Sequence, residues 1–144
     1  MFKNILIAYD GSDGSKECLN AGTEISKGLN ANLIALWVGG YKPYYHETKG
    51  EIDEEILAVE KFAQKLKQQI DEYNTTESMK IRFDYVIGNP AKEIVAYAKK
   101  NKADTIIIGY KGHSGLWENL LGHVADKVSE NASCNVLIVK KPKK

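Results

Sequence analysis

The stretch TIIIGYKGHSGLWENLLGHV, residues 105–124, determines how the rest of the sequence is interpreted. It opens with three consecutive isoleucines, a pattern typical of a short strand buried on both faces. Gly109, Gly112 and Gly122 follow, and the apolar residues after Gly122 are spaced as in a helix. Glycine lets backbone N–H groups come close to a ligand, and a helix N-terminus offers unpaired donors. This order of elements therefore predicts an anion site.

The composition is that of an ordinary globular protein, and we expect residues 1–144 to form one domain. The chain is 43% hydrophobic and 27% charged, with a formal net charge of +1. This near-neutral balance gives no reason to expect nucleic acid as a partner. The sequence shows no signal peptide and no apolar run long enough to cross a bilayer, which predicts a cytoplasmic protein with no membrane partner. Cys18 and Cys134 fit no metal or redox spacing and are predicted to be core residues.

Apolar runs and helical patterns alternate along the chain. Five segments are predicted to be strands, at residues 3–8, 33–38, 79–87, 106–108 and 135–139. The clearest helix is predicted at residues 51–73, where apolar residues recur at steps of three and four. Polar residues predict a loop at 41–50 and a turn at 74–78. The alternation predicts an α/β fold with a single doubly wound parallel sheet and helices on both faces.

Two loops with suitable ligand chemistry follow predicted strands. One is Tyr9-Asp10-Gly11-Ser12, and the other is the glycine stretch. In open parallel sheets, ligands bind at the carboxyl ends of the strands where the strand order reverses. The two loops would face one crevice if the first and fourth strands are neighbours. Asp10 by itself fits an ordinary turn, but together with the glycine stretch a ligand role is favoured.

Several segments together resemble the universal stress protein family over nearly the whole chain. They are ILIAYDGS, ALWV, VIGNPAKEIVAYAKKNKADTIIIG and GYKGHSGLWENLLGHVADKVSENASCNVLIV. The nucleotide-binding branch of that family has the signature Gly, two residues, Gly, nine residues, Gly, then Ser or Thr. The three glycines of the stretch match it in identity and spacing.

The resemblance implies a five-stranded sheet of order 3-2-1-4-5, of the adenine nucleotide alpha hydrolase-like type. It also implies a regulatory or stress-response protein that binds ATP or AMP, with Mg²⁺ possible beside ATP. Within the implied site, the first loop contacts adenine and ribose, an aliphatic residue lines the base pocket, and the glycine stretch holds ribose and phosphates. The matching positions are Tyr9, Asp10, Val38, Ile108, Gly109, Gly112, Gly122, His123 and Val124.

One position departs from the family pattern, because His123 stands where the family has Ser or Thr. Its imidazole can donate hydrogen bonds but is much bulkier than a hydroxyl. Binding of phosphate and an exposed, solvated ring stay open as alternatives. Lys111 and His113, in the loop before it, could add positive charge near a phosphate, although ordinary exposure in the loop is the favoured interpretation for both.

His123 also favours an alternative function, a protein-interaction module of the same fold that binds no nucleotide. A response-regulator receiver would need a second aspartate where Gly88-Asn89 stands, which argues against that class. The sequence suggests no catalytic triad, carboxylate pair, metal cluster or Walker motif. The protein is therefore predicted not to be a dedicated enzyme, with slow ATP hydrolysis as an open alternative.

The last predicted strand is apolar on both faces and would form an edge of the sheet. Such an edge tends to pair with another strand. The resemblance implies antiparallel pairing with a second copy. The sequence therefore predicts a homodimer through Val136, Leu137, Ile138 and Val139.

Overall fold

The computed structural model describes residues 1–40, 48–111 and 121–141. Strands and helices alternate from one end to the other. In chain order they are β1 (Asn4–Ala8), α1 (Asp13–Leu29), β2 (Asn32–Gly39), α2 (Lys49–Glu77), β3 (Arg82–Ile87), α3 (Pro90–Lys100), β4 (Thr105–Gly109), α4 (His123–Asn131) and β5 (Asn135–Val139).

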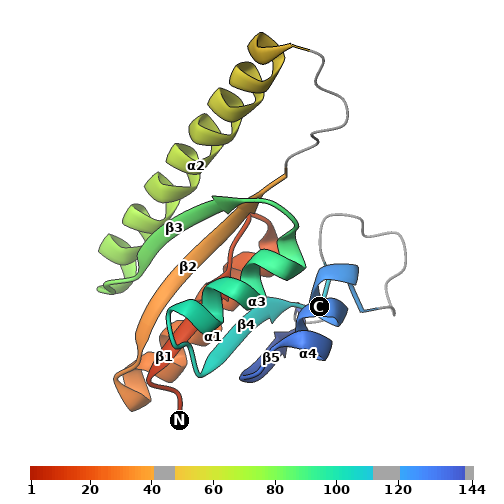
Figure 1. Ribbon diagram of the computed structural model, residues 1–144. Helices are drawn as coiled ribbons and strands as arrows, with labels where there is room; N and C mark the ends of the chain where they lie inside the picture. The colour runs from red at the N-terminus through yellow and green to blue at the C-terminus, as the bar shows by residue number, and fades with distance from the viewer. Residues whose placement is uncertain (41–47, 112–120, 142–144) are drawn as a thin grey trace.

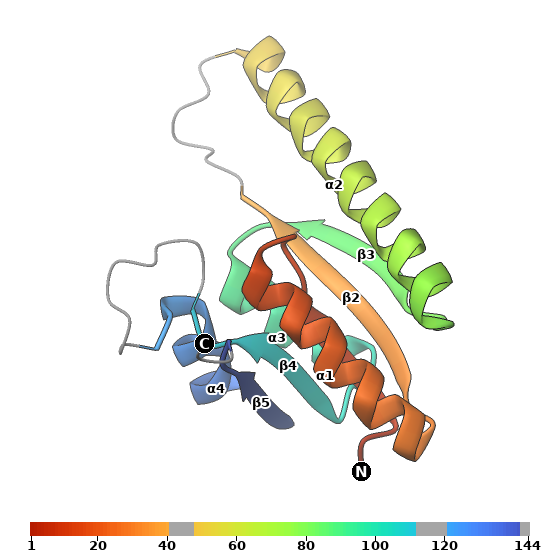
Figure 2. The same cartoon turned by 180° about the vertical axis from the view of Figure 1, so that it is seen from behind.

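All five strands form one parallel sheet in the order β3-β2-β1-β4-β5, which confirms the predicted topology. Helices α3 and α4 cover the face seen in Figure 1, and α1 and α2 cover the opposite face, seen in Figure 2. Parallel strands need long crossover connections, and the helices provide them. The sheet order reverses between β1 and β4, which are neighbours, as the shared crevice requires.

Two apolar clusters, one on each face, form the core. Ile7 and Ile107 belong to the cluster under α1 and α2, and Leu6 and Ile106 belong to the one under α3 and α4. These four side chains are at most 1% exposed. Because successive side chains of a strand point to opposite faces, a central strand covered on both sides is apolar throughout. This is why the isoleucine run in β4 has no polar alternation.

The cysteines differ in their surroundings. Cys18 is 0% exposed within the core, which confirms its predicted role. Burial, followed by the negative charge of Asp10, raises the pKa of the Cys18 thiol to about 12. Since the thiolate is the nucleophile, Cys18 is expected to be inert at neutral pH. Cys134 is only partly buried.

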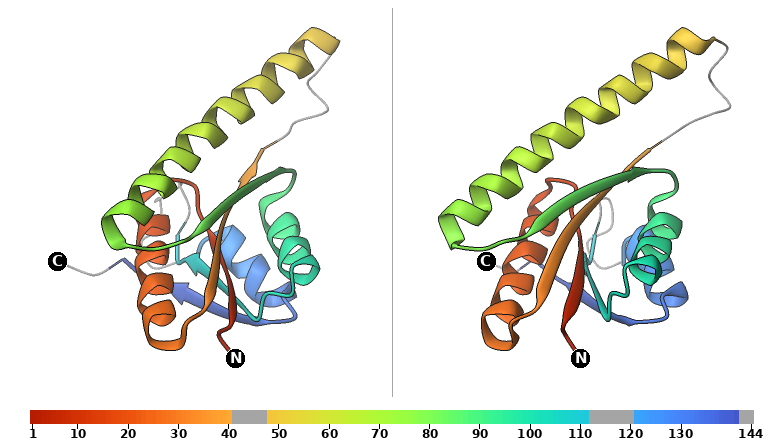
Figure 3. Two further views of the ribbon diagram at one scale, coloured as in Figure 1. Left: turned by 90° about the vertical axis from the view of Figure 1, so that its left-hand side faces the viewer. Right: turned by 60° about the vertical axis from the view of Figure 1, so that its left-hand side comes forward.

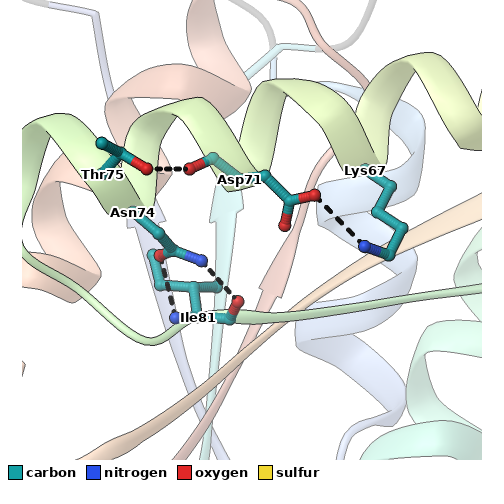
Figure 4. Close-up of polar contacts among 5 residues, drawn as sticks. All are labelled: Lys67, Asp71, Asn74, Thr75 and Ile81. Carbon is teal, nitrogen blue, oxygen red and sulfur yellow. Dashed lines mark hydrogen bonds and ion pairs between the residues drawn. The ribbon is translucent and has the colours of Figure 1, made fainter.

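Helix α2 is longer than predicted, and the predicted turn at residues 74–78 is wrong. The helix continues to Glu77 and ends at Ser78, which adopts a left-handed conformation. Figure 4 shows the reason: the Asn74 amide donates to the Ile81 carbonyl, and its oxygen accepts from the Ile81 N–H, both at 2.9 Å. The Thr75 hydroxyl donates to the Asp71 carbonyl at 3.1 Å. Side chains that usually favour turns here extend the helix and hold the start of β3.

The Asp104 side chain connects the amino ends of β1 and β4 through hydrogen bonds. One carboxylate oxygen accepts from the backbone N–H groups of Lys3 and Asn4, at 2.8 and 2.9 Å. The other accepts from the Thr105 hydroxyl at 3.0 Å. Burial acts to raise the pKa of Asp104, but these hydrogen bonds together hold it below its usual value.

Replacing Asp104 with alanine is expected to lower the free energy of unfolding by about 1–3 kcal/mol, because two backbone donors lose a charged acceptor. Since folding lowers the pKa of Asp104, its contribution is present above the unfolded-state pKa, about 4, and is lost as the pH falls through the lower folded value. Urea unfolding at neutral pH and at about pH 2.5 tests both points. A gap between wild type and Asp104→Ala that does not shrink in acid would contradict this account.

No helix in the described part of the chain has the length and hydropathy of a membrane span. The cytoplasmic location stays a prediction.

Candidate functional site

A cavity of about 310 Å³ opens at the carboxyl ends of β1, β2 and β4. It lies where the sheet order reverses, between the turn after β1 and the start of α4. The predicted site residues that line it are Tyr9, Asp10, Val38, Ile108, Gly109 and Val124. The structure thus brings the first loop and the described ends of the glycine stretch to one crevice. The size of the cavity falls within the range of small-molecule pockets.

The inner wall of the cavity is mainly apolar. Val38 comes from β2, Ile108 from β4 and Val124 from α4, while Pro90 and Ile94 come from the first turns of α3. Neither Pro90 nor Ile94 is among the site residues predicted from the sequence. Their position after a predicted strand could have indicated a role in the site, because α3 begins beside the carboxyl end of β3. Aliphatic side chains on several sides suit a flat ring system.

The backbone of Val38 faces the cavity side of β2. The ladder between β1 and β2 continues to the Tyr9 N–H, which donates to the Leu36 carbonyl at 2.9 Å. On the other side of β2, the Gly39 carbonyl accepts from the Gly88 N–H. In a strand, the N–H and C=O of one residue point to the same side, and those of the next residue point to the other side. Leu36 faces β1, so Val38, two residues later, also directs its N–H and C=O to the side of β1. Strand β1 ends at Ala8, so these groups point towards the crevice.

Asp10 is held at the rim by its own turn. Its carboxylate accepts from the Ser12 N–H at 2.9 Å, and its N–H donates to the Ser15 hydroxyl at 3.3 Å. Ser12 in turn caps α1 by accepting from the Ser15 N–H at 3.2 Å. The turn and the cap thus fix the direction of the Asp10 side chain.

Tyr9 lines the cavity, but its hydroxyl is used elsewhere. The hydroxyl donates to the Gln69 side chain on α2 at 2.5 Å, and the ring belongs to the cluster under α1 and α2. Burial, followed by the charge of Asp10, raises the pKa of Tyr9 to about 12. The Tyr9 side chain therefore anchors the turn to α2.

Helix α4 begins beside the cavity without a side-chain cap. Gly122 occupies the cap position, and its own N–H donates to the Tyr110 carbonyl at 2.7 Å. The next three N–H groups, of His123, Val124 and Ala125, belong to the first turn and have no partner within the helix. In contrast, Ser12, Thr48 and Asn89 cap the other three described helices. The start of α4 therefore offers donors to an anion.

Gly112 lies outside the described residues. The His123 side chain is exposed at the first residue of α4 and is not part of the cavity wall. Lys111 is half-buried and lines the cavity, which differs from the favoured interpretation of an exposed loop residue and agrees with the alternative of a cation near the site. The described residues contain no group of three or more His, Cys, Asp or Glu side chains placed to hold a metal ion.

Comparison with known families identifies the chain. The model of the universal stress protein family matches residues 1–140. The chain belongs to the universal stress protein family. A universal stress protein of Methanocaldococcus jannaschii is 39% identical, over 100% of this chain and 85% of that protein. The structure of the universal stress protein UspA from Lactobacillus plantarum superposes with a TM-score of 0.85 at 22% identity, covering 96% of this chain and 97% of the other.

Two further structures of this fold contain an adenine nucleotide. One is a universal stress protein in complex with cAMP, with a TM-score of 0.69 and 22% identity over 95% of this chain and 96% of that one. The other is a family protein from Arabidopsis thaliana with AMP bound, with a TM-score of 0.67 and 14% identity over 97% and 92% of the two chains. At these identities the likeness shows the shared fold.

Proposed function

We propose that this universal stress protein, acting as one domain, binds AMP or ATP in the crevice as a regulatory or stress-response protein. One observation carries the proposal: the Asp10 turn, the apolar wall and the uncapped start of α4 meet around a single cavity. The adenine nucleotides in two structures of the same fold support the choice of ligand class.

The base is proposed to lie in the apolar part of the cavity, against Val38 and Ile94. The Val38 carbonyl would accept from the adenine amino group, and the Val38 N–H would donate to the adjacent ring nitrogen. Guanine presents a carbonyl oxygen where adenine has the amino group, so its donors and acceptors are reversed at this edge. The arrangement therefore favours adenine over guanine.

The ribose and phosphates are proposed to lie between Asp10 and α4. The Asp10 carboxylate accepts hydrogen bonds from ribose hydroxyls, and the N–H groups of His123 and Val124 donate to phosphate oxygens. Packing of the described residues does not require glycine at position 109, because an added Cβ would meet its nearest atoms at 3.6 Å, an ordinary contact. The missing side chain instead leaves room for a ligand to approach the backbone. With ATP, Mg²⁺ would be held chiefly by phosphate oxygens, as is usual for this ion. Gly112 stays a predicted phosphate-loop residue.

Isothermal titration calorimetry with AMP, ATP and GTP tests the proposal. We expect heat of binding for at least one adenine nucleotide with the protein at high micromolar concentration. GTP is expected to bind at least about tenfold more weakly, because it leaves the Val38 groups mismatched. No heat with either adenine nucleotide would overturn the proposal for the isolated protein.

The second candidate function is an interaction module of the same fold that binds no nucleotide. It is favoured by His123, which places an exposed imidazole at the first residue of α4 where the family pattern has a hydroxyl. A His123→Ser variant that binds ATP, beside a wild type that does not, would establish this alternative.

We also propose that two copies pair through β5. This strand is an edge of the sheet, and its Leu137 side chain is 38% exposed. Replacing Leu137 with aspartate should weaken dimerisation at least about tenfold, because the symmetric contact would bring two carboxylates into an apolar interface. Light scattering at micromolar concentration measures the mass.

The matched control lies on the opposite edge of the sheet. Ile87 on β3 is 37% exposed, so Ile87→Asp introduces the same charge on a comparable edge residue. This variant should keep the wild-type mass. A monomeric wild type, or equal effects of the two substitutions, would contradict the proposed dimer.

A further inference from the structure

The first turns of α2 form an acidic end that extends beyond the sheet. Residues 49–60, here called the acidic tip, carry five carboxylates against one lysine. Figures 1 and 3 show this part of α2 projecting away from the strands, while the later turns cross β2 and β3. Within the tip, Ile56 is 37% exposed and Leu57 is 52% exposed. The tip therefore combines negative charge with uncovered apolar surface.

The opposite end of the molecule is basic. The amino ends of the strands and the ends of α1, α2 and α3 gather seven exposed cations, here called the basic end: Lys3, Lys27, Lys80, Arg82, Lys99, Lys100 and Lys102. None of the seven forms an ion pair with a carboxylate of the described residues.

Two carboxylates near the basic end are engaged by other groups of the protein, while Glu77 at the end of α2 is exposed. The Asp104 carboxylate accepts hydrogen bonds from the backbone N–H groups of Lys3 and Asn4. The Asp84 carboxylate accepts a hydrogen bond from the Tyr97 hydroxyl at 2.7 Å. Lysines near the ends of helices partly offset the helix dipoles. That effect does not explain Lys3, Lys80 or Arg82, which lie outside the helices.

A groove runs across this end. Its volume is about 550 Å³, and Lys80 and Arg82 line it together with the side chains of Asn4, Asn32 and Asn101. Nearby, Met1 is 78% exposed and Leu29 is 57% exposed. The groove thus offers cations, amide groups and some apolar surface, which complement the acidic tip in both charge and polarity.

We propose that the acidic tip of one copy docks in the groove at the basic end of a second copy. The groove is lined by residues at the amino ends of β1, β2 and β3. These strand ends lie at the opposite end of the molecule from the tip (Figure 1, Figure 3), so a chain cannot fill its own groove. The contact is therefore head to tail. Unlike a symmetric pair, it leaves a free tip and a free groove at the two ends of the assembly, which can grow.

Because opposite charges drive this contact, its strength depends on ionic strength. Sedimentation velocity of the full chain at about 20 mM and about 500 mM salt measures this dependence. We expect assemblies that grow with protein concentration at low salt and dissociate at high salt. A wild-type mass that is independent of salt overturns the proposal.

Two charge-reversed variants give the sharper test. Asp53→Lys with Glu54→Lys and Glu60→Lys changes the net charge of the tip from −4 to +2, and Lys80→Glu with Arg82→Glu reverses the two cations that line the groove. Each alone should lower the head-to-tail association constant at least about tenfold, because attraction becomes repulsion. An equal mixture should restore association, since the reversed tip then meets the reversed groove. The proposed β5 contact is the same in both variants, so a gain in mass on mixing reports the head-to-tail contact alone.

Lys16→Glu with Lys92→Glu is the matched control, because it makes the same charge change on exposed lysines towards the other end of the sheet. Its association should stay within about twofold of wild type. Lys99→Glu with Lys100→Glu provides a second variant of the basic end, beside the groove, if the first does not fold, as judged by circular dichroism. A mixture that does not restore association, or a control that loses as much as the groove variants, overturns the proposal.

Discussion

Replacing Asp10 with alanine is expected to lower the affinity for AMP and ATP by about tenfold to one hundredfold, because a hydrogen bond to a charged acceptor is worth about 1.5–3 kcal/mol. The carboxylate lies at the cavity rim, where its turn and the cap of α1 fix its direction. Calorimetry gives the affinity, and thermal unfolding shows whether the loss of the Ser12 contact also weakens the fold.

Asp10→Asn is the matched control. Its amide oxygen can still accept from the Ser12 N–H, so the turn is kept while the charge is removed. We expect its stability to be close to wild type and its affinity to lie between wild type and Asp10→Ala. Full affinity in the alanine variant would place the ribose elsewhere and contradict the proposed site.

Replacing Ile107 with alanine is expected to give the largest loss of stability, about 2–5 kcal/mol, because the void in a covered strand cannot collapse fully. The Ile107 side chain is 0% exposed, and β4 lies between β1 and β5. Urea unfolding followed by circular dichroism measures the change in free energy.

Ile107→Val removes one methylene group from the same position and should cost only about 0.5–1.5 kcal/mol. The ratio of the two losses separates a packing effect from a general disturbance of the strand. Equal losses for valine and alanine would contradict tight packing at this position.

The fold could be predicted from sequence because its signals are local and repeated. Apolar runs such as Ile106 to Ile108 arise from burial on both faces, and strands alternating with helices allow few topologies. The order of the strands was implied by the resemblance, and the pairing of β1 with β4 confirms it. The meeting of the Asp10 turn with Gly109 follows from that pairing.

The errors and omissions concern interactions that a local pattern does not contain. Asn74 was interpreted as part of a turn because its contacts to Ile81 lie seven residues further along the chain. The hydroxyl of Tyr9 binds Gln69 on α2, and the Gly122 N–H binds Tyr110, so neither group is available to a ligand in this structure. Spacing alone shows which residues lie near a site, but it does not show which atoms another part of the protein already engages.

Titration of ¹⁵N-labelled protein with AMP, followed by amide chemical shifts, tests nucleotide binding in the crevice most directly. Saturable shifts are expected at Val38, Gly109, His123 and Val124, around the cavity between β1 and β4. Amides at the amino ends of the strands, such as Asn32, should stay unchanged. An unchanged spectrum at saturating nucleotide, or shifts confined to the amino ends, would contradict the account.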